Sequence, residues 1–191
     1  MNYKHNKEKV IQKGVELFWV KGYHSLGVNE ICEETGMTKG AFYNTFKSKE
    51  KFLLTTIASY GDIIVSHLQA QLSGKKTSAF YSLVTLYKNM LLAQTSNNYM
   101  GCLVNNMMSE MGTSYDAVAA MAAKQFKRFL MVIEPAVKEA QEAGDFDNNI
   151  SSECLAEIIH TTFFGFLTRS KSTKTTNHEA MTSFFNILKN R

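Results

Sequence analysis

The segment TKGAFYNTFKSK, residues 38–49, carries polar and basic side chains at a spacing suited to contacts with a polyanion. Phe42 and Phe46 are four residues apart, so on a helix they share one face and are expected to pack inward. Tyr43 and Asn44 then point away from that face. Their polar tips suit phosphate oxygens, which would fix the helix on a nucleic acid.

The two ends of this segment favour double-stranded DNA as the polyanion. Thr38 can cap the helix, because its hydroxyl can accept a hydrogen bond from a free amide of the first turn. Lys39, Gly40 and Ala41 open the helix with little bulk, which would let the backbone approach a duplex closely. Lys49 stands at the start of the next helix, where a cation opposes the helix dipole. A nearby polyanion explains that lysine better than local stability does.

Three predicted helices position these residues. Apolar residues recur at helical spacing from Val10 to Phe18, and that helix ends near Gly22. A second helix ends at Gly36, a residue suited to a left-handed C-terminal cap. A helix, a turn that contains glycine and a short second helix form a helix-turn-helix, whose second helix lies in the major groove of DNA.

Composition agrees with a small DNA-binding part joined to a larger helical part. Residues 1–53 hold nine lysines and six acidic residues, a net charge of +3, whereas the other residues hold twelve basic and eleven acidic ones, a net charge of +1. Patterns with a period of 3.6 are long, and there is one proline in 191 residues. The sequence therefore predicts an all-α fold with a helix-turn-helix DNA-binding domain over 1–50 and a larger helical domain over 51–191.

Several classes of protein are not supported by the sequence. No apolar run reaches the ~18 residues of a membrane span, and the start MNYKHNKEK lacks the apolar segment of a signal peptide, so we expect a cytoplasmic protein without a membrane partner. The three cysteines form no CxxC pair, which argues against a disulfide framework or a zinc site. There is no Gly-rich phosphate loop, HExxH or GxSxG, so neither an enzyme nor a cofactor is expected.

The N-terminal part resembles the DNA-binding domain of the TetR family of bacterial transcriptional regulators over roughly residues 7–52. The following residues carry the resemblance: Val10, Ile11, Leu17, Phe18, Lys21, Gly22, Tyr23, Val28, Ile31, Gly36, Met37, Thr38, Lys39, Gly40, Ala41, Phe42, Tyr43, Phe46, Ser48 and Lys49. Three features depart from the usual family pattern. Gly14 stands where alanine is usual, Leu26-Gly27 replaces a Thr-Ser type of cap, and Asn44 replaces a histidine or tyrosine.

The resemblance implies roles for the residues of the short helix. Lys39, Gly40 and Ala41 would face base edges, whereas Tyr43, Asn44 and Lys49 would hold phosphates; two of these have alternatives, since Tyr43 could be a core aromatic residue and Lys49 a solvated charge. The resemblance also implies that residues 51–191 form a helical ligand-binding and dimerisation domain. The homodimer would be formed by the last two long helices of each copy and would bind a palindromic operator. Such a dimer would act as a repressor and would answer to a small-molecule inducer of unknown identity.

The inducer site would lie in the larger domain, because helical sensors of this size usually enclose an apolar pocket with a few polar groups. The candidate lining residues are Tyr60, Met107, Met111, Phe126, His160 and Phe163. Plain packing in the core is the alternative for each of them. For His160, a buried histidine with a hydrogen-bond partner is the preferred interpretation over a contact with ligand or metal.

Cys102 is a separate sensor candidate. It follows Gly101 at the expected start of a helix, where free amides stabilise a thiolate that can react with electrophiles and oxidants. Gly101-Cys102-Leu103 also resembles the matching segment of the electrophile-responsive, NemR-like subgroup of the family. The alternative is a small buried residue at a tight helix start, which the absence of an adjacent basic residue favours.

Two other functions remain open at the level of the sequence. One is a regulator of this type that activates transcription, or answers to a protein partner without a small inducer. The other is a cysteine-dependent enzyme built around Cys102, for which the sequence offers no further catalytic motif.

Overall fold

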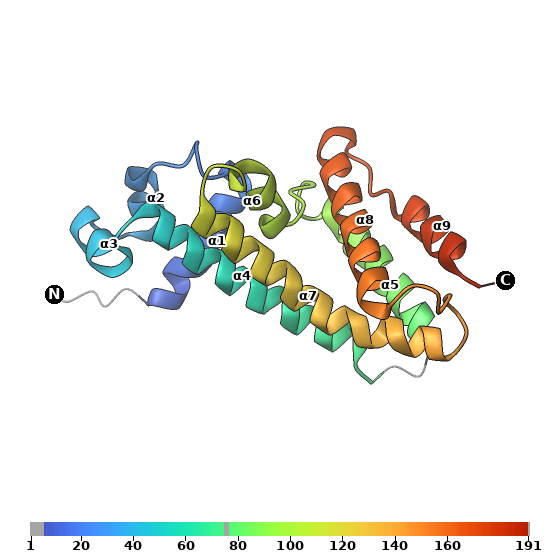
Figure 1. Ribbon diagram of the computed structural model, residues 1–191. Helices are drawn as coiled ribbons and strands as arrows, with labels where there is room; N and C mark the ends of the chain where they lie inside the picture. The colour runs from blue at the N-terminus through green and yellow to red at the C-terminus, as the bar shows by residue number, and fades with distance from the viewer. Residues whose placement is uncertain (1–5, 75–76, 191) are drawn as a thin grey trace. The chain divides into compact units, whose positions relative to one another are not determined.

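The chain folds into helices, as the sequence predicts. A computed structural model describes residues 6–74 and 77–190, and Figure 1 shows their path. The described α-helices are α1 (Lys7–Lys21), α2 (Val28–Thr35), α3 (Lys39–Phe46), α4 (Lys49–Leu72), α5 (Ala79–Leu92), α6 (Leu103–Met111), α7 (Asp116–Glu142), α8 (Ser152–Thr173) and α9 (His178–Leu188). A short 3-10 helix, Ala93–Thr95, follows α5. Strand-like pairing in the described residues is limited to one isolated bridge, between Phe146 and Lys189.

The described residues pack as two compact units. Unit 1 holds the residues up to Ile63 together with Cys102–Phe126, and unit 2 holds Ile64–Gly101 together with the residues from Lys127 onward. The two longest helices, α4 and α7, each contribute residues to both units. This is a division by packing, so the functional division at residue 50 stays a prediction. Within the described ranges, no helix is both long enough and apolar enough to cross a bilayer.

Helix ends in unit 1 follow from local sequence signals. Gly36 ends α2 in the left-handed conformation, with φ of 68°. The Thr38 hydroxyl accepts a hydrogen bond from the amide of Ala41 at 3.2 Å and so caps α3. The Ser48 hydroxyl does the same at the start of α4, where the amide of Lys51 donates to it at 3.0 Å. The cap predicted for α3 is therefore confirmed.

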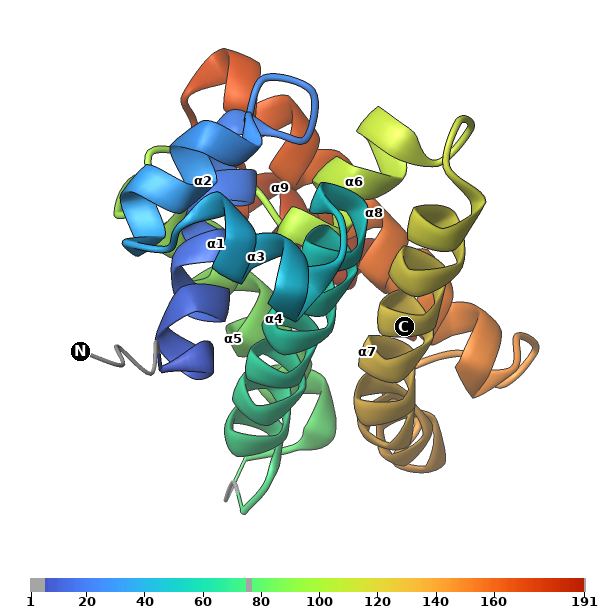
Figure 2. The ribbon, with the colours of Figure 1, turned by 90° about the vertical axis from the view of Figure 1, so that its left-hand side faces the viewer.

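An aromatic core fixes α3 in unit 1. Phe42 and Phe46 are buried, as predicted, and their ring centroids lie 5.4 Å and 4.5 Å from that of Phe52 on α4. Phe18 of α1 lies 5.8 Å from the same ring. Figure 2 shows α1, α2 and α3 grouped together in this unit. Two buried aromatic side chains thus hold one face of α3, so the opposite face is free for contacts outside the unit.

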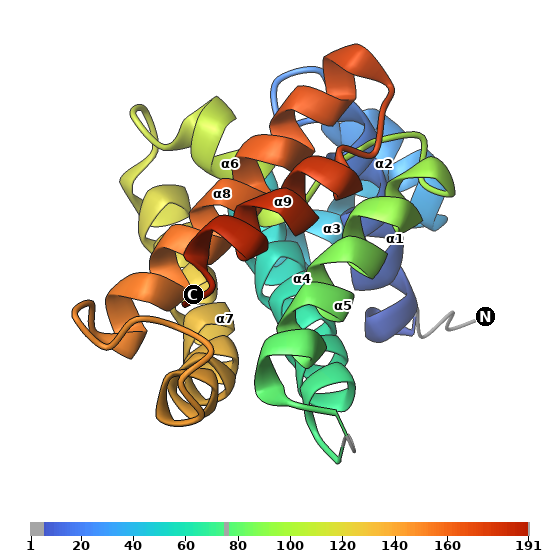
Figure 3. The same ribbon diagram turned by 90° about the vertical axis from the view of Figure 1, so that its right-hand side faces the viewer.

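Unit 2 is built on contacts of α5 with α8 and α9, which lie side by side in Figure 3. Its core is aromatic: Tyr87 of α5 lies 5.2 Å from Phe163 of α8 and 5.7 Å from Phe185 of α9, measured between ring centroids. Phe80 adds a second contact with Phe185 at 6.2 Å. Burial of such large rings supplies much of the stability of a helical unit.

Candidate nucleic-acid interface and sensor region

The outward face of α3 gathers most of the residues predicted to contact DNA. Lys39, Gly40, Tyr43 and Asn44 are exposed, and Tyr43 keeps 47% of its surface accessible although it is aromatic. Among the described residues, no atom outside the adjoining residues and the nearby backbone of α3 lies within 4 Å of the position that a Cβ atom on Gly40 would take. Ala41 is half-buried. The start of α3 is therefore a small, open and basic surface that the molecule itself does not cover.

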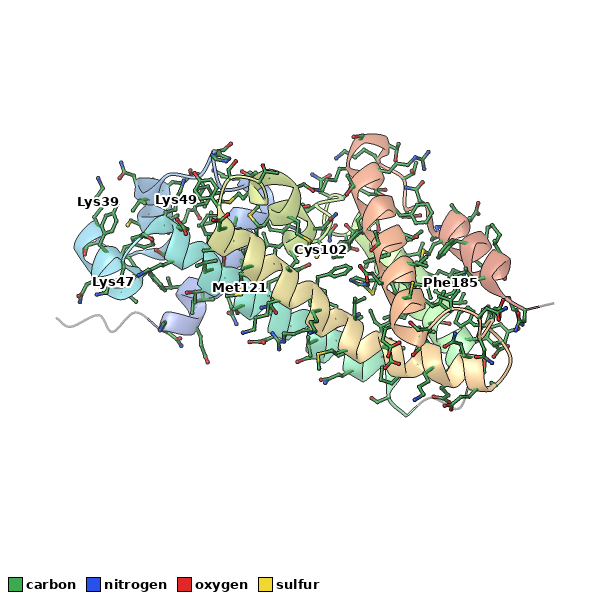
Figure 4. All side chains as sticks on the ribbon, in the orientation of Figure 1. Lys39, Lys47, Lys49, Cys102, Met121 and Phe185 are labelled. Atoms are coloured by element: carbon green, nitrogen blue, oxygen red, sulfur yellow. The ribbon has the colours of Figure 1, made fainter. Side chains whose placement is uncertain are left out.

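Lys47 joins this surface, although the sequence prediction did not include it among the DNA-contacting residues. It ends α3 with φ of 68°, a conformation that side-chain-bearing residues seldom adopt, and its Nζ donates to the carbonyl of Asn44 at 2.8 Å. Its side chain is exposed. Figure 4 shows Lys39 and Lys47 at the two ends of α3. Two cations thus flank the outward face of the helix, and the basic run after Phe46 was the signal for the second one.

Lys49 has internal partners. Its Nζ donates to the carbonyl oxygens of Tyr23 and Leu26, each at 2.9 Å, and lies 4.0 Å from the centroid of the Tyr23 ring. Burial lowers the pKa of Lys49, while the charge of Glu110 acts in the opposite direction. These contacts tie the start of α4 to residues 22–27, the segment between α1 and α2 that we call the α1–α2 turn. A contact of Lys49 with phosphate stays a prediction.

Cys102 occupies the N-cap position of α6 and is buried. The phenol of Tyr60 forms a hydrogen bond with its thiol, and the amide of Leu103 bonds to the same phenol. Burial is the main cause that raises the pKa of Tyr60 well above its usual value, and the neighbouring thiol adds to it. Both residues belong to unit 1. Two of the predicted sensor residues are therefore in contact.

The other predicted lining residues divide between the units. Met107 and Met111 on α6 are buried and Phe126 on α7 is half-buried, and all three belong to unit 1. His160 and Phe163 on α8 belong to unit 2. Met107, Met111, His160 and Phe163 are buried in the cores of their units, and a role of any of these side chains in binding an inducer stays a prediction.

His160 lies in an aromatic environment inside unit 2. Its Nδ1 lies 3.1 Å from the hydroxyl of Tyr87, and the rings of Phe129, Phe163 and Phe164 surround it at centroid distances of 5.8 Å, 5.7 Å and 4.7 Å. Burial lowers the pKa of His160 to about 3 and raises that of Tyr87. The imidazole is therefore neutral at physiological pH and bonded to a phenol. Across the residues that the structure describes, no three His, Cys, Asp or Glu side chains are grouped closely enough to hold a metal ion.

Comparison with known families decides the class of this molecule. Residues 10–56 match the family described as bacterial regulatory proteins, tetR family, and residues 83–184 match the family described as tetracyclin repressor-like, C-terminal domain. The second match alone covers more than half of the chain. The chain belongs to the TetR family. It is accordingly a DNA-binding transcriptional regulator, and α3 is the second helix of its helix-turn-helix.

Relatives of known name extend the likeness to both parts of this TetR-family chain. The HTH-type transcriptional repressor DhaR of Mycobacterium sp. (strain GP1) is 25% identical over 183 residues, which cover 95% of this chain and 89% of DhaR. The transcriptional regulator AcuR of Cereibacter sphaeroides is 30% identical over 172 residues, which cover 86% of this chain and 75% of AcuR.

Solved structures agree on the TetR fold. The regulatory protein TetR from Rhodobacter sphaeroides superposes with a TM-score of 0.87 at 24% identity, over 96% of this chain and 98% of that one. The reduced form of Escherichia coli NemR superposes with a TM-score of 0.83 at 17% identity, over 96% of this chain and 97% of that one. At these identities the likeness establishes the fold and leaves the ligand open.

Proposed function

We propose that this TetR-family chain is a cytoplasmic repressor that binds a palindromic operator as a homodimer and leaves it when a small molecule or a modification acts on the larger helical part. The observation that carries the proposal is the outward face of α3. Lys39 and Lys47 flank it, Gly40 leaves it open, and Tyr43 exposes a polar tip that the core does not use.

The chemistry of this face separates affinity from specificity. Lysine can donate to guanine, and the methyl group of alanine can touch the methyl group of thymine, so Lys39 and Ala41 would contact base edges. Tyr43, Asn44 and Lys47 would contact phosphates, which position the helix without recognising sequence. A single α3 of eight residues offers few such contacts, so tight binding needs a second copy.

Exposed apolar side chains on unit 2 support association of two copies. Ile158 on α8 is 39% exposed and Ile187 on α9 is 80% exposed, while Phe166 and Phe184 on the same two helices are half-buried. Large apolar side chains on adjacent helices favour burial against a partner. A two-fold dimer through α8 and α9 would present two α3 helices to two symmetric half-sites.

Release from DNA requires a ligand or modification that distinguishes two conformations of the dimer, because equal binding to both shifts nothing. A non-covalent inducer in the larger domain is one route. The other is modification of Cys102, which lies at the N-cap of α6 and whose thiol forms a hydrogen bond with Tyr60. Comparison of Cys102→Ser with wild type separates the two routes.

The test uses a duplex that the wild-type protein selects from a random library. Lys39→Ala and Tyr43→Ala should each weaken binding to this duplex, with loss of base preference for Lys39→Ala alone. If Cys102 is the sensor, N-ethylmaleimide should release wild-type protein from the duplex and leave Cys102→Ser bound. If the reagent releases neither protein, the inducing signal is assigned to a non-covalent ligand. Unchanged affinity in both α3 variants would contradict the proposed interface.

A further inference from the structure

The α1–α2 turn is held from α6 by a single carboxylate. Glu110 Oε1 accepts hydrogen bonds from the amides of Tyr23 at 2.9 Å and His24 at 3.0 Å, and Oε2 lies 3.2 Å from the amide of Tyr23. The two residues bonded to Glu110 precede it by 87 and 86 positions in sequence. All of these residues belong to unit 1. Glu110 therefore connects a helix of the ligand-binding part to the segment that leads into the helix-turn-helix.

The backbone of the turn is shaped for this carboxylate. Gly22 has φ of 72°, and a Cβ atom there would lie 2.8 Å from Glu110 Oε2, closer than side chains approach. The ring of Tyr115, just before α7, contacts Tyr23 and His24 with centroid distances of 5.4 Å and 6.1 Å. A glycine in this conformation and a covering aromatic ring bring the amides to the carboxylate. The Glu110 carboxylate thus meets a turn whose shape depends on Gly22 and on the ring of Tyr115.

Lys49 binds the same turn through its ammonium group, whose charge is opposite to that of the Glu110 carboxylate. Its ammonium donates to the carbonyls of Tyr23 and Leu26, while Glu110 accepts from the amides of Tyr23 and His24. Bonds between charged and backbone groups are stronger than bonds between neutral ones. Four backbone groups of the turn are therefore bonded to these two side chains, and α2, which follows the turn, packs against α3.

We propose that Glu110 is a positioning residue for DNA binding: its carboxylate fixes the α1–α2 turn, and through the turn it sets the placement of α2 and α3. The proposal rests on the proposed contact of α3 with the operator. Its physical basis is preorganisation, because a segment that is already ordered loses less entropy when it binds. Removing the acceptor would loosen the turn and weaken binding to DNA while the core of unit 1 stays intact.

The variants separate the acceptor from the charge. Glu110→Ala removes both, whereas Glu110→Gln keeps a carbonyl oxygen that can replace Oε1, the atom that accepts both bonds. Asp116→Asn is the matched control, since it removes one exposed carboxylate at the start of α7 in the same unit. Thermal unfolding of each variant checks that the fold is retained.

The first measurement is hydrogen exchange of the peptide that covers the α1–α2 turn, which needs no DNA. The amide hydrogens of Tyr23 and His24 should exchange faster in Glu110→Ala than in wild type. In Asp116→Asn they should exchange at the wild-type rate. The second measurement is affinity for the duplex selected by wild type. Glu110→Ala should bind about tenfold more weakly, because both charge-assisted hydrogen bonds of the carboxylate are lost and the loosened turn must be ordered when DNA binds. The affinity of Glu110→Gln should stay within about threefold of wild type, because the amide oxygen still accepts the hydrogen bonds. The remaining loss is expected because a neutral acceptor makes a weaker bond than a charged one.

The outcomes distinguish this inference from the proposed function. If wild type selects no duplex, the proposed interface fails, and with it the role of Glu110 in DNA binding. If wild type binds and Glu110→Ala binds equally well or more tightly, the inference fails and the proposed function stands. A lower melting temperature with unchanged affinity would assign Glu110 a purely structural role, which also overturns the inference.

Discussion

Lys47 and Lys49 are two residues apart, yet their ammonium groups face different surroundings. Lys47 is exposed, whereas Lys49 is half-buried and donates to two carbonyls of the α1–α2 turn. An ion pair with phosphate releases counterions, so affinity falls as salt rises. Each lost contact lowers the absolute slope of log affinity against log salt by about 0.9. We predict that Lys47→Met lowers this slope, and that Lys49→Met weakens binding with little change in slope.

The measurement is operator affinity by fluorescence anisotropy over a series of salt concentrations. Lys51→Met, near the start of α4, serves as a control for loss of one positive charge. Equal reductions in slope for Lys47→Met and Lys49→Met would mean that Lys49 leaves the turn to contact phosphate.

His160 makes the stability of unit 2 depend on pH. Burial lowers the pKa of His160 in the folded protein from its usual 6.5 to about 3. Between these values the unfolded chain binds a proton that the folded chain does not, so the free energy of unfolding falls as the pH drops through this window. The expected loss at pH 5 relative to pH 7 is about 2 kcal/mol, since one pKa unit corresponds to about 1.4 kcal/mol.

Denaturant unfolding at pH 7 and pH 5 tests this prediction. The matched variant is the pair His160→Leu with Tyr87→Phe, which removes both partners of the buried hydrogen bond and leaves no phenol without an acceptor. The pair should lose less stability at pH 5 than wild type does. An equal loss in both proteins would show that other groups cause the dependence on pH.

At the scale of helices, Gly14 sets how closely α1 and α4 approach each other. A Cβ atom on Gly14 would lie 2.4 Å from Cζ of Phe52 and 2.7 Å from Cγ2 of Thr56. Phe52 is fully buried among other aromatic rings and cannot yield easily. Gly14→Ala should therefore destabilise the protein by about 1–3 kcal/mol, a cost of overpacking that exceeds the gain in helix propensity.

Gly40 is the matched control, because it also lies in a helix and has open space at the Cβ position. Gly40→Ala should stabilise the protein by up to about 1 kcal/mol in thermal unfolding without DNA. The same substitution should weaken DNA binding, because the added methyl group lies on the outward face of α3. A stabilised Gly14→Ala variant would contradict the packing described for α1 and α4.

Local elements were predictable because their signals are local. The caps at Thr38 and Ser48, the left-handed Gly36 and the buried pair Phe42 and Phe46 all depend on residues within one or two turns of each other. The sequence therefore predicted the start of α3, its inward face and the predominance of helices.

Long-range partners were not predictable from one sequence. Lys49 finds its acceptors 26 and 23 residues away, and Glu110 finds its donors 87 and 86 residues away. Nothing in the residues near Glu110 distinguishes it from a solvated carboxylate on a helix. Its role depends on which turn the fold brings next to α6, and that follows from tertiary packing alone.

At the scale of the whole molecule, a dimeric operator-binding regulator needs one surface for DNA and another for a second copy. The excess of positive charge lies in residues 1–53, which contain α3 with Lys39 and Lys47. Exposed apolar side chains lie on α8 and α9, at the other end of the chain. A basic α3 and apolar side chains on α8 and α9 together suit a dimer that presents two copies of α3 to one duplex.

Selection of bound duplexes from a random library, followed by sequencing, tests whether this protein binds a palindromic operator as a dimer. We expect a palindrome whose half-sites lie about 34 Å apart, one turn of DNA, or a multiple of it, because a two-fold dimer places two α3 helices in successive major grooves. Tyr43→Ala protein should enrich the same palindrome less strongly. Enrichment of no sequence, or of a single half-site without symmetry, would contradict the account of a dimeric operator-binding regulator.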